Sequence, residues 1–196
     1  MTRILTPGLV AEGDTDEVFL GIVITRQLRE LTWGSSRCSV IVEETEVGSC
    51  RSIMDADRVG DTLRALSADC HVLFVHNDHR ERGKVSRVIA EVGVATPVVG
   101  LVPVRETEAW LLADAHAWQG VKGSRADLLP SRPAGVESIL DPKKVLDRVV
   151  PPRGRPIRDY FEYIGRNINL DVLAQVPAYA VWVTETKNVL KGLGYL

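Results

Sequence analysis

Short apolar runs alternate with amphipathic stretches over the first two-thirds of the chain. We predict four strands from the apolar runs, at residues 8–12 (GLVAE), 38–44 (CSVIVEE), 71–78 (HVLFVHND) and 96–104 (TPVVGLVPV). Apolar residues recur at helical spacing after each run, and we predict helices at residues 15–31, 51–69, 82–93 and 106–118. This alternation of strand and helix predicts an α/β fold, with a mainly parallel sheet and helices on both faces.

The pattern changes near residue 120, where proline, glycine and arginine become frequent. Asp141 and Pro142 together indicate a helix start, with the aspartate as N-cap and the proline in the first turn. A further helix is predicted around residues 181–190. We therefore divide the chain into an α/β domain at residues 1–120 and a helical C-terminal extension at residues 121–196 that packs on it.

The composition is that of an ordinary globular protein, with 45% hydrophobic and 26% charged residues among 196. The formal net charge of −2 gives no overall attraction to nucleic acid, so any such contact needs a local basic patch or a metal ion. Three cysteines without a CxxC spacing indicate reduced thiols. No apolar run approaches the roughly 20 residues of a membrane span, and the start does not resemble a signal peptide. We expect a cytoplasmic protein without a membrane contact.

Acidic side chains follow three of the predicted strands. Glu12 follows the first, Asp78 the third, and Glu106 and Glu108 the fourth. Parallel sheets bind ligands beyond the carboxyl ends of their strands, where converging carboxylates suit Mg²⁺. Glu12 and Asp16 are four residues apart and could face one point at a helix start. The alternative is an acidic first turn that serves the helix dipole.

The segment VHNDHRER at residues 75–82 has two interpretations. Asp78 could be a metal ligand, or the segment could be a polar loop that caps the next helix. His76 and His79 indicate zinc only weakly, because no cysteine or HxxxH partner accompanies them. Glu108 could be a further ligand in the same site, and Glu106 could equally be an acid that favours a helix start.

Several common functional motifs are absent from the sequence. It contains no GxxxxGK[ST] run, no GxGxxG after the first strand and no GxSxG, which disfavours P-loop, Rossmann and α/β-hydrolase enzymes. Arginines and aromatic residues do alternate in the second half, at Arg148, Arg153, Arg155, Arg158, Tyr160, Phe161, Tyr163 and Arg166. These residues could bind nucleic acid or form a solvated edge of the helical extension.

The segments VAEGDTDEVFL, HVLFVHND and VPVRETEAWLLAD together resemble the Toprim fold, the metal-binding domain of topoisomerases, primases and OLD-type nucleases. More closely, the chain resembles a Toprim-like bacterial family of unknown function, whose helical tail is similar to DPKKVL and VPAYAVWV here. The resemblance implies a four-stranded parallel sheet flanked by helices, with a Mg²⁺-type site. Both acids of the first motif serve the metals in OLD-type nucleases, and these match Glu12 and Asp16.

An acidic pair, DxD, follows the third strand in the families that the chain resembles. The corresponding text here is HNDHR, which allows three registers. With Asp78 in the first place the second is Arg80, and with Asp78 in the second place the first is His76. A third register pairs Asn77 with His79. Every register lacks at least one carboxylate, so a site with one metal, or one that binds without catalysis, is compatible with the sequence.

The leading hypothesis is phosphodiester cleavage of nucleic acid, DNA or RNA, with Mg²⁺ or Mn²⁺ as cofactor. Its metal ligands are Glu12, Asp16, Asp78 and Glu108. Glu12 could instead be a general base, and Lys84 or Arg80 could stabilise charge that develops on the phosphate.

Two rival hypotheses remain. A Toprim-like subunit with weakened catalysis could regulate or bind a partner, and the resemblance implies bacterial defence modules in which an ATPase is a separate chain. The absence of a P-loop agrees with that arrangement, and the apolar C-terminal helix could form a homodimer interface. An α/β protein could instead bind a small phosphorylated ligand at helix N-termini, although clustered carboxylates would repel it.

Overall fold

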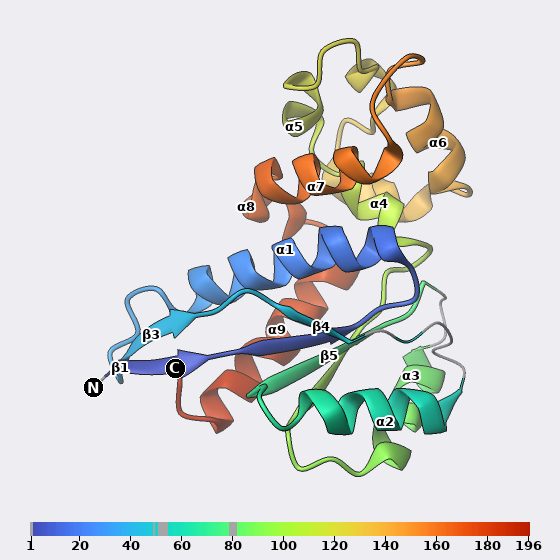
Figure 1. The fold of residues 1–196 in the computed structure, drawn as a ribbon. Coiled ribbons are helices and arrows are strands. Elements are labelled where there is room, and N and C mark those ends of the chain that lie inside the picture. The colour runs from blue at the N-terminus through green and yellow to red at the C-terminus, as the bar shows by residue number, and fades with distance from the viewer. Residues whose placement is uncertain (1, 49, 51–54, 79–81) are drawn as a thin grey trace.

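The computed structural model describes residues 2–48, 50, 55–78 and 82–196 (Figure 1). Its centre is a four-stranded, entirely parallel sheet in the order β4-β2-β5-β6. The strands are β2 (Pro7–Val10), β4 (Glu46–Gly48), β5 (Val72–His76) and β6 (Val98–Leu101). Leu9 lies opposite Phe74, and Phe74 lies opposite Val99. The predicted α/β class, with a mainly parallel four-stranded sheet, is confirmed.

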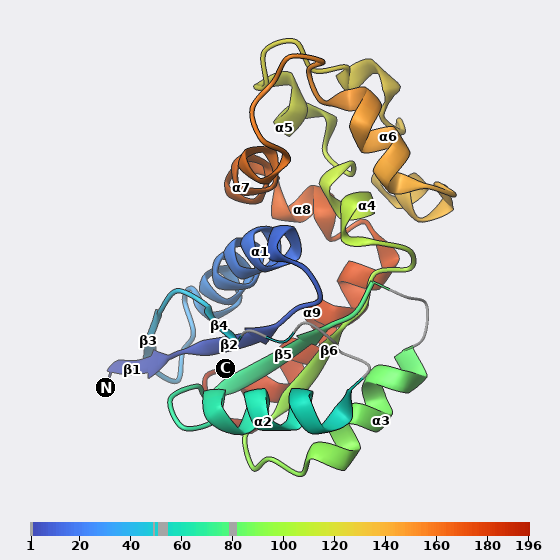
Figure 2. The same ribbon diagram turned by 45° about the vertical axis from the view of Figure 1, so that its right-hand side comes forward.

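Alternate residues of the central strands face opposite sides of the sheet, as the pleat requires. Leu9 and Phe74 belong to one hydrophobic core, whereas Val10 and Val75 belong to a second core on the other face. Helices α1 (Asp14–Thr32) and α9 (Pro177–Gly192) cover the first face, and α2 (Ala56–Leu66) and α3 (Arg82–Val92) cover the second (Figure 2). Both faces are therefore buried, which explains the continuous apolar runs of β2 and β5.

A second, two-stranded parallel sheet was not predicted. Strand β1 (Thr2–Leu5) pairs with β3 (Ser39–Val42), so the run predicted at residues 38–44 lies here, and β4 takes the place beside β2. Thr6 separates β1 from β2. Its N–H donates to His71 Nδ1 at 3.1 Å, and its hydroxyl donates to Glu43 Oε2 at 2.7 Å. The carbonyl oxygen of Thr6 still accepts from the backbone N–H of His71 at 2.8 Å, so a side-chain partner replaces backbone pairing only at the N–H of this residue.

The region that follows β6 differs from the prediction at residues 106–118. The helix expected at residues 106–118 is two short helices, α4 (Thr107–Leu111) and α5 (Ala115–Gln119), because Asp114 caps α5 through the N–H groups of His116 and Ala117. The remaining elements are η1 (Ala126–Leu128), η2 (Pro133–Ser138), α6 (Pro142–Val149), α7 (Ile157–Asn167) and α8 (Leu170–Leu173). Asp141 is the N-cap of α6, as predicted.

The second half packs on α1 and on the sheet. Phe161 of α7 meets Phe19 of α1 edge to face, with ring centroids 6.5 Å apart. Arg26 of α1 donates to the carbonyl oxygens of Gly165 and Ile168. Trp182 of α9 contacts Phe74 of β5 with ring centroids 5.7 Å apart. One core therefore runs from the sheet through α1 and α9 into the C-terminal helices.

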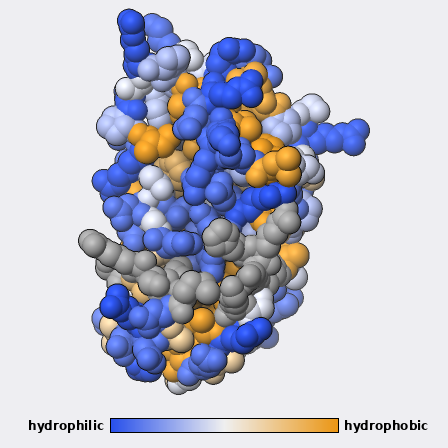
Figure 3. All heavy atoms as spheres, turned by 90° about the vertical axis from the view of Figure 1, so that its right-hand side faces the viewer, coloured by the Kyte–Doolittle hydropathy of each residue, from blue (hydrophilic) through white to orange (hydrophobic). Residues whose placement is uncertain are grey.

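The carboxyl ends of β2, β5 and β6 lie at one edge of the sheet because the strands are parallel. Figure 3 views the molecule from that side, and hydrophilic side chains gather in the middle of its upper half. Among the helices described, none is both long enough and apolar enough to cross a membrane.

Candidate functional site

Three buried side chains meet at the carboxyl edge of the sheet. Asp16 lies in the first turn of α1, His76 is the last residue of β5, and Asp78 follows two positions later. Each offers one possible ligand atom, and these atoms lie within 4.8 Å of one another. This Asp16–His76–Asp78 group could hold a metal ion.

The fold explains why these residues converge. Residues two apart at a strand end point to the same side, which places His76 beside Asp78. Asp16 reaches the same edge because β2, which leads into α1, pairs with β5. Gly13, the N-cap of α1, allows the Asp16 carboxylate to lie against the backbone, since a Cβ at Gly13 would stand only 3.1 Å from Asp16 Oδ2.

Thr107, the first residue of α4, holds His76 and Asp78 in place. Its backbone N–H donates to Asp78 Oδ1 at 2.9 Å, and its hydroxyl lies 3.2 Å from the same oxygen. The hydroxyl is also 2.9 Å from His76 Nε2, which is itself 3.3 Å from Asp78 Oδ1. Asp78 Oδ1 is thus fully engaged, which leaves Oδ2 as its outward-facing oxygen.

Lys143, in the first turn of α6, brings a positive charge to the rim of this group. Its Nζ lies 3.8 Å from Asp78 Oδ2, 3.2 Å from Glu106 Oε1 and 3.9 Å from Glu108 Oε1. The Lys143 side chain is 55% exposed, whereas that of Glu108 is only 8% exposed. The ammonium group therefore lies between solvent and a set of largely buried acids.

Burial and mutual repulsion set the protonation of the acids. Burial raises the pKa of Asp16, and the nearby Asp78 charge raises it further against the opposing effect of His76. Burial also raises the pKa of Glu108, to about 7, although Lys143 opposes the shift. Burial acts on Asp78 in the same direction, but hydrogen bonds from His76 and Thr107 outweigh it, and its pKa is lowered. Asp78 is therefore the most persistent negative charge of the three.

Several buried polar atoms around the group have unused bonding capacity. Within the described residues, His76 Nδ1, Glu106 Oε2 and Glu108 Oε2 have no hydrogen-bond partner. Buried polar atoms normally have partners, so such a concentration needs an explanation. A divalent cation provides one, because carboxylate oxygens and imidazole nitrogen together suit ions such as Mn²⁺. The residues present therefore fit a metal ion chemically.

The structure brings together some of the predicted site residues. Asp16 and Asp78 belong to the buried group, and Glu108 contacts the same lysine as Asp78. Glu12 is exposed and does not belong to the group, and its role as ligand or base stays a prediction. Arg80 lies outside the described residues. Lys84 lies in α3, and only its backbone is described.

The site also contains residues that we did not assign from the sequence. His76 belongs to the buried group together with Asp78, and the two-residue spacing of these residues at a strand end was the available signal. Thr107 and Lys143 had no comparable signal, because their partners are distant in the sequence.

The arrangement combines a buried acid–imidazole group with an ammonium group at its rim. Such a combination can hold a cation and, next to it, an anionic ligand that Lys143 can reach. No family model, curated protein or solved structure matches the chain, so the choice among functions depends on the chemistry of this site.

Proposed function

We propose that the protein is a Mg²⁺- or Mn²⁺-dependent enzyme that cleaves phosphodiester bonds in nucleic acid. The observation that supports this proposal most strongly is the buried Asp16–His76–Asp78 group, whose ligand atoms lie within 4.8 Å of one another beside Lys143. The resemblance of the same segments to Toprim domains points to the same chemistry.

Asp16, His76 and Asp78 would hold the metal, and Glu108 would supply a further oxygen from its buried, unpartnered Oε2. A bound divalent ion would draw electrons from a phosphoryl oxygen and favour attack by water. Thr107 keeps His76 and Asp78 in a fixed orientation through its N–H and hydroxyl groups. The protein thus supplies a site whose ligands need little rearrangement on metal binding.

Lys143 has a separate role in this proposal. Its ammonium group can move from the carboxylates to a substrate phosphate once a metal ion neutralises those carboxylates. A cation next to a reacting phosphate stabilises the negative charge that develops there. This is the role that the sequence suggested for Lys84 or Arg80, and those two assignments remain proposals alongside Lys143.

The test compares matched aspartate variants. Wild-type protein with Mn²⁺ or Mg²⁺ should cleave a labelled single-stranded DNA or RNA oligonucleotide and hydrolyse bis(p-nitrophenyl) phosphate, and EDTA should abolish both reactions. Asp16→Asn and Asp78→Asn should each lose at least about 100-fold in rate, since each removes a charged ligand. Asp14→Asn is the control, because Asp14 lies in the same helical turn but is exposed. Wild-type activity in both ligand variants, or no activity in the wild type, would overturn the proposal.

One observation favours the rival role of a regulatory subunit, with an ATPase as a separate chain. Lys143 already neutralises part of the acidic cluster, as a permanent cation would in a site without metal. Calorimetric titration of wild type and Asp78→Asn with Mn²⁺ separates the two roles. Binding tighter than millimolar that the variant loses supports the enzyme, and its absence supports the subunit.

A further inference from the structure

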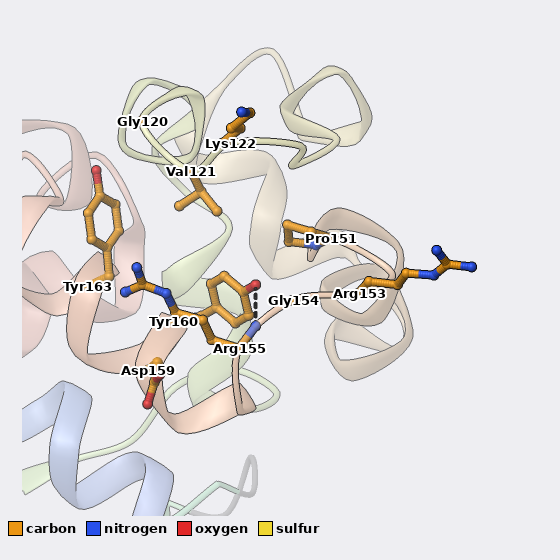
Figure 4. Close-up of a pocket in the computed structure, with 10 residues that line it drawn as sticks. All are labelled: Gly120, Val121, Lys122, Pro151, Arg153, Gly154, Arg155, Asp159, Tyr160 and Tyr163. Atoms are coloured by element: carbon orange, nitrogen blue, oxygen red, sulfur yellow. Dashed lines mark hydrogen bonds between the residues drawn. The ribbon is translucent and has the colours of Figure 1, made fainter.

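A second candidate site lies among the C-terminal helices, separate from the Asp16–His76–Asp78 group. It is a pocket of about 480 Å³ between the segment that follows α5 and the loop that joins α6 to α7 (Figure 4). Its volume is within the range of pockets that hold small ligands. The walls come from residues 120–122, Pro151, residues 153–155 and the first two turns of α7.

Two tyrosines give the pocket fixed aromatic walls. The hydroxyl of Tyr160 accepts a hydrogen bond from the backbone N–H of Arg155 at 3.1 Å, and its ring stacks on Trp118 with centroids 6.2 Å apart. The hydroxyl of Tyr163 lies against Gly120, where a Cβ atom would collide with it. The tyrosines are thus positioned before any ligand binds.

The pocket is also positively charged, in a protein whose net charge is −2. Lys122, Arg153 and Arg155 line it, with Asp159 as the opposing acid. Within the described part of the chain no ion pair engages these three cations, whereas Arg125 nearby is paired with Asp127. In Figure 4 the Arg155 side chain extends towards Tyr163, while that of Arg153 points away from the pocket. Arg155 is therefore the cation placed closest to the aromatic walls.

We propose that this pocket binds one nucleotide of a single-stranded nucleic acid, with the base against the partly exposed Tyr163 and the phosphate on Arg155 and Lys122. Aromatic rings stack on nucleic-acid bases whatever the sequence, and unpaired cations bind the phosphates that link successive nucleotides. The choice of nucleic acid as the ligand rests on the proposed function.

The position of the pocket suits a substrate that reaches both sites. Lys143 stands at the start of α6, and Pro151 follows its end. Eight helical residues span about 12 Å, so the pocket and the acidic group are a few nucleotides apart along one helix. A bound strand could therefore run along α6 from the pocket to the acidic group.

Fluorescence anisotropy with a fluorescein-labelled single-stranded DNA 12-mer, in EDTA so that no cleavage occurs, tests the proposal. Arg155→Ala and Tyr163→Leu should each weaken binding at least about fivefold, and Arg155→Ala should also reduce the slope of log K against log salt by about one. Arg64→Ala is the control, since it removes the same charge from α2 on the opposite face of the sheet. Thermal melting checks that each variant is folded.

The outcomes separate this inference from the proposed function. The pocket assignment is overturned if both pocket variants bind with wild-type affinity. It is also overturned if wild-type protein in 100-fold excess over the labelled DNA does not bind it, even if the protein cleaves phosphodiesters. Weaker binding in both variants supports it even if wild-type protein fails to hydrolyse bis(p-nitrophenyl) phosphate. Adenosine 5′-monophosphate is a competitor in the same experiment. Displacement of the 12-mer by equimolar mononucleotide would mean that the pocket serves a free nucleotide, and would overturn the assignment to a strand.

Discussion

The ammonium nitrogen of Lys143 lies 3.2 Å from Oε1 of Glu106, and this contact joins the start of α6 to the residue before α4. The same nitrogen lies within 4 Å of carboxylate oxygens of Asp78 and Glu108. These carboxylates raise the pKa of Lys143, although burial acts in the opposite direction, so the lysine stays charged at neutral pH. A metal ion that enters the site therefore competes with a charge that the protein already holds there.

Replacement of Lys143 should change metal binding and catalysis in opposite directions. Lys143→Met removes the competing charge, and we expect Mn²⁺ to bind about two- to fivefold more tightly, the size of effect expected for a half-exposed ion pair. Cleavage of an oligonucleotide should nevertheless fall about tenfold or more, because the cation next to the phosphate is lost. Isothermal titration and initial rates measure the two effects. Lys144→Met, which changes an exposed lysine paired with Asp141, should alter neither.

The imidazole of His76 should set the choice of metal. Mg²⁺ prefers an all-oxygen site, whereas Mn²⁺ accepts a nitrogen ligand, so we expect the wild type to bind Mn²⁺ at least about tenfold more tightly than Mg²⁺. His76→Asp replaces the nitrogen ligand by a carboxylate and should reduce that ratio. His116→Asp, on an exposed histidine of α5, is the matched control. Equal preference in the wild type and His76→Asp would show that His76 is not a ligand.

The raised pKa of Glu108 predicts a pH dependence of stability in the absence of metal. The pKa is about 7 in the folded protein and 4.5 in the unfolded chain, so the folded state retains the proton more strongly. This contribution is complete below pH 4.5 and is lost as the pH rises through 7. Melting temperature should therefore fall between pH 5 and pH 8, by an amount that corresponds to at most about 3 kcal/mol.

Glu108→Gln tests this dependence because it removes the titrating group. The variant should lose less stability than the wild type between pH 5 and pH 8, and at pH 8 the metal-free variant should be the more stable protein. Glu12→Gln serves as the control, since Glu12 is exposed. Parallel pH profiles for wild type and Glu108→Gln would contradict the assignment.

The central sheet could be predicted because its signal is local. Successive residues such as Leu9 and Val10, or Phe74 and Val75, place apolar side chains on opposite faces of the sheet. Short apolar runs of this kind, separated by helices, indicate a parallel sheet that is buried on both faces. Strand β1, which precedes the predicted first strand, could not be predicted, because its separation from β2 depends on Thr6 bonding to His71 and Glu43. Those partners are far from Thr6 in the sequence.

The candidate site also contains residues with a local sequence signal and residues whose partners are distant in the sequence. Asp16 and Asp78 could be placed together because each follows a strand of one parallel sheet. Lys143 could not, because it comes from a helix of the second half, and only the packing of α6 on α4 brings it to the acids. Apolar spacing describes one helix at a time and contains no information on which helices meet.

Asp114 is the clearest case of a local signal that the apolar pattern concealed. Its buried carboxylate accepts hydrogen bonds from the N–H groups of His116 and Ala117, which starts α5, and from the N–H of Asn169, which precedes α8. Asp114→Ala should lower the free energy of unfolding by about 2–4 kcal/mol, because it removes an N-cap and leaves a further N–H without its partner.

Urea denaturation of Asp114→Ala and Asp141→Ala compares the loss in the free energy of unfolding at Asp114 with the loss at a residue that only caps a helix. Asp141 caps α6 through a single N–H in an exposed position, so its loss should cost about 1 kcal/mol. Asp114→Asn should lie between the wild type and Asp114→Ala, since the amide oxygen can still cap α5 but carries no charge. If Asp114→Ala costs no more than Asp141→Ala, then the bond to Asn169 does not stabilise the junction between α5 and α8.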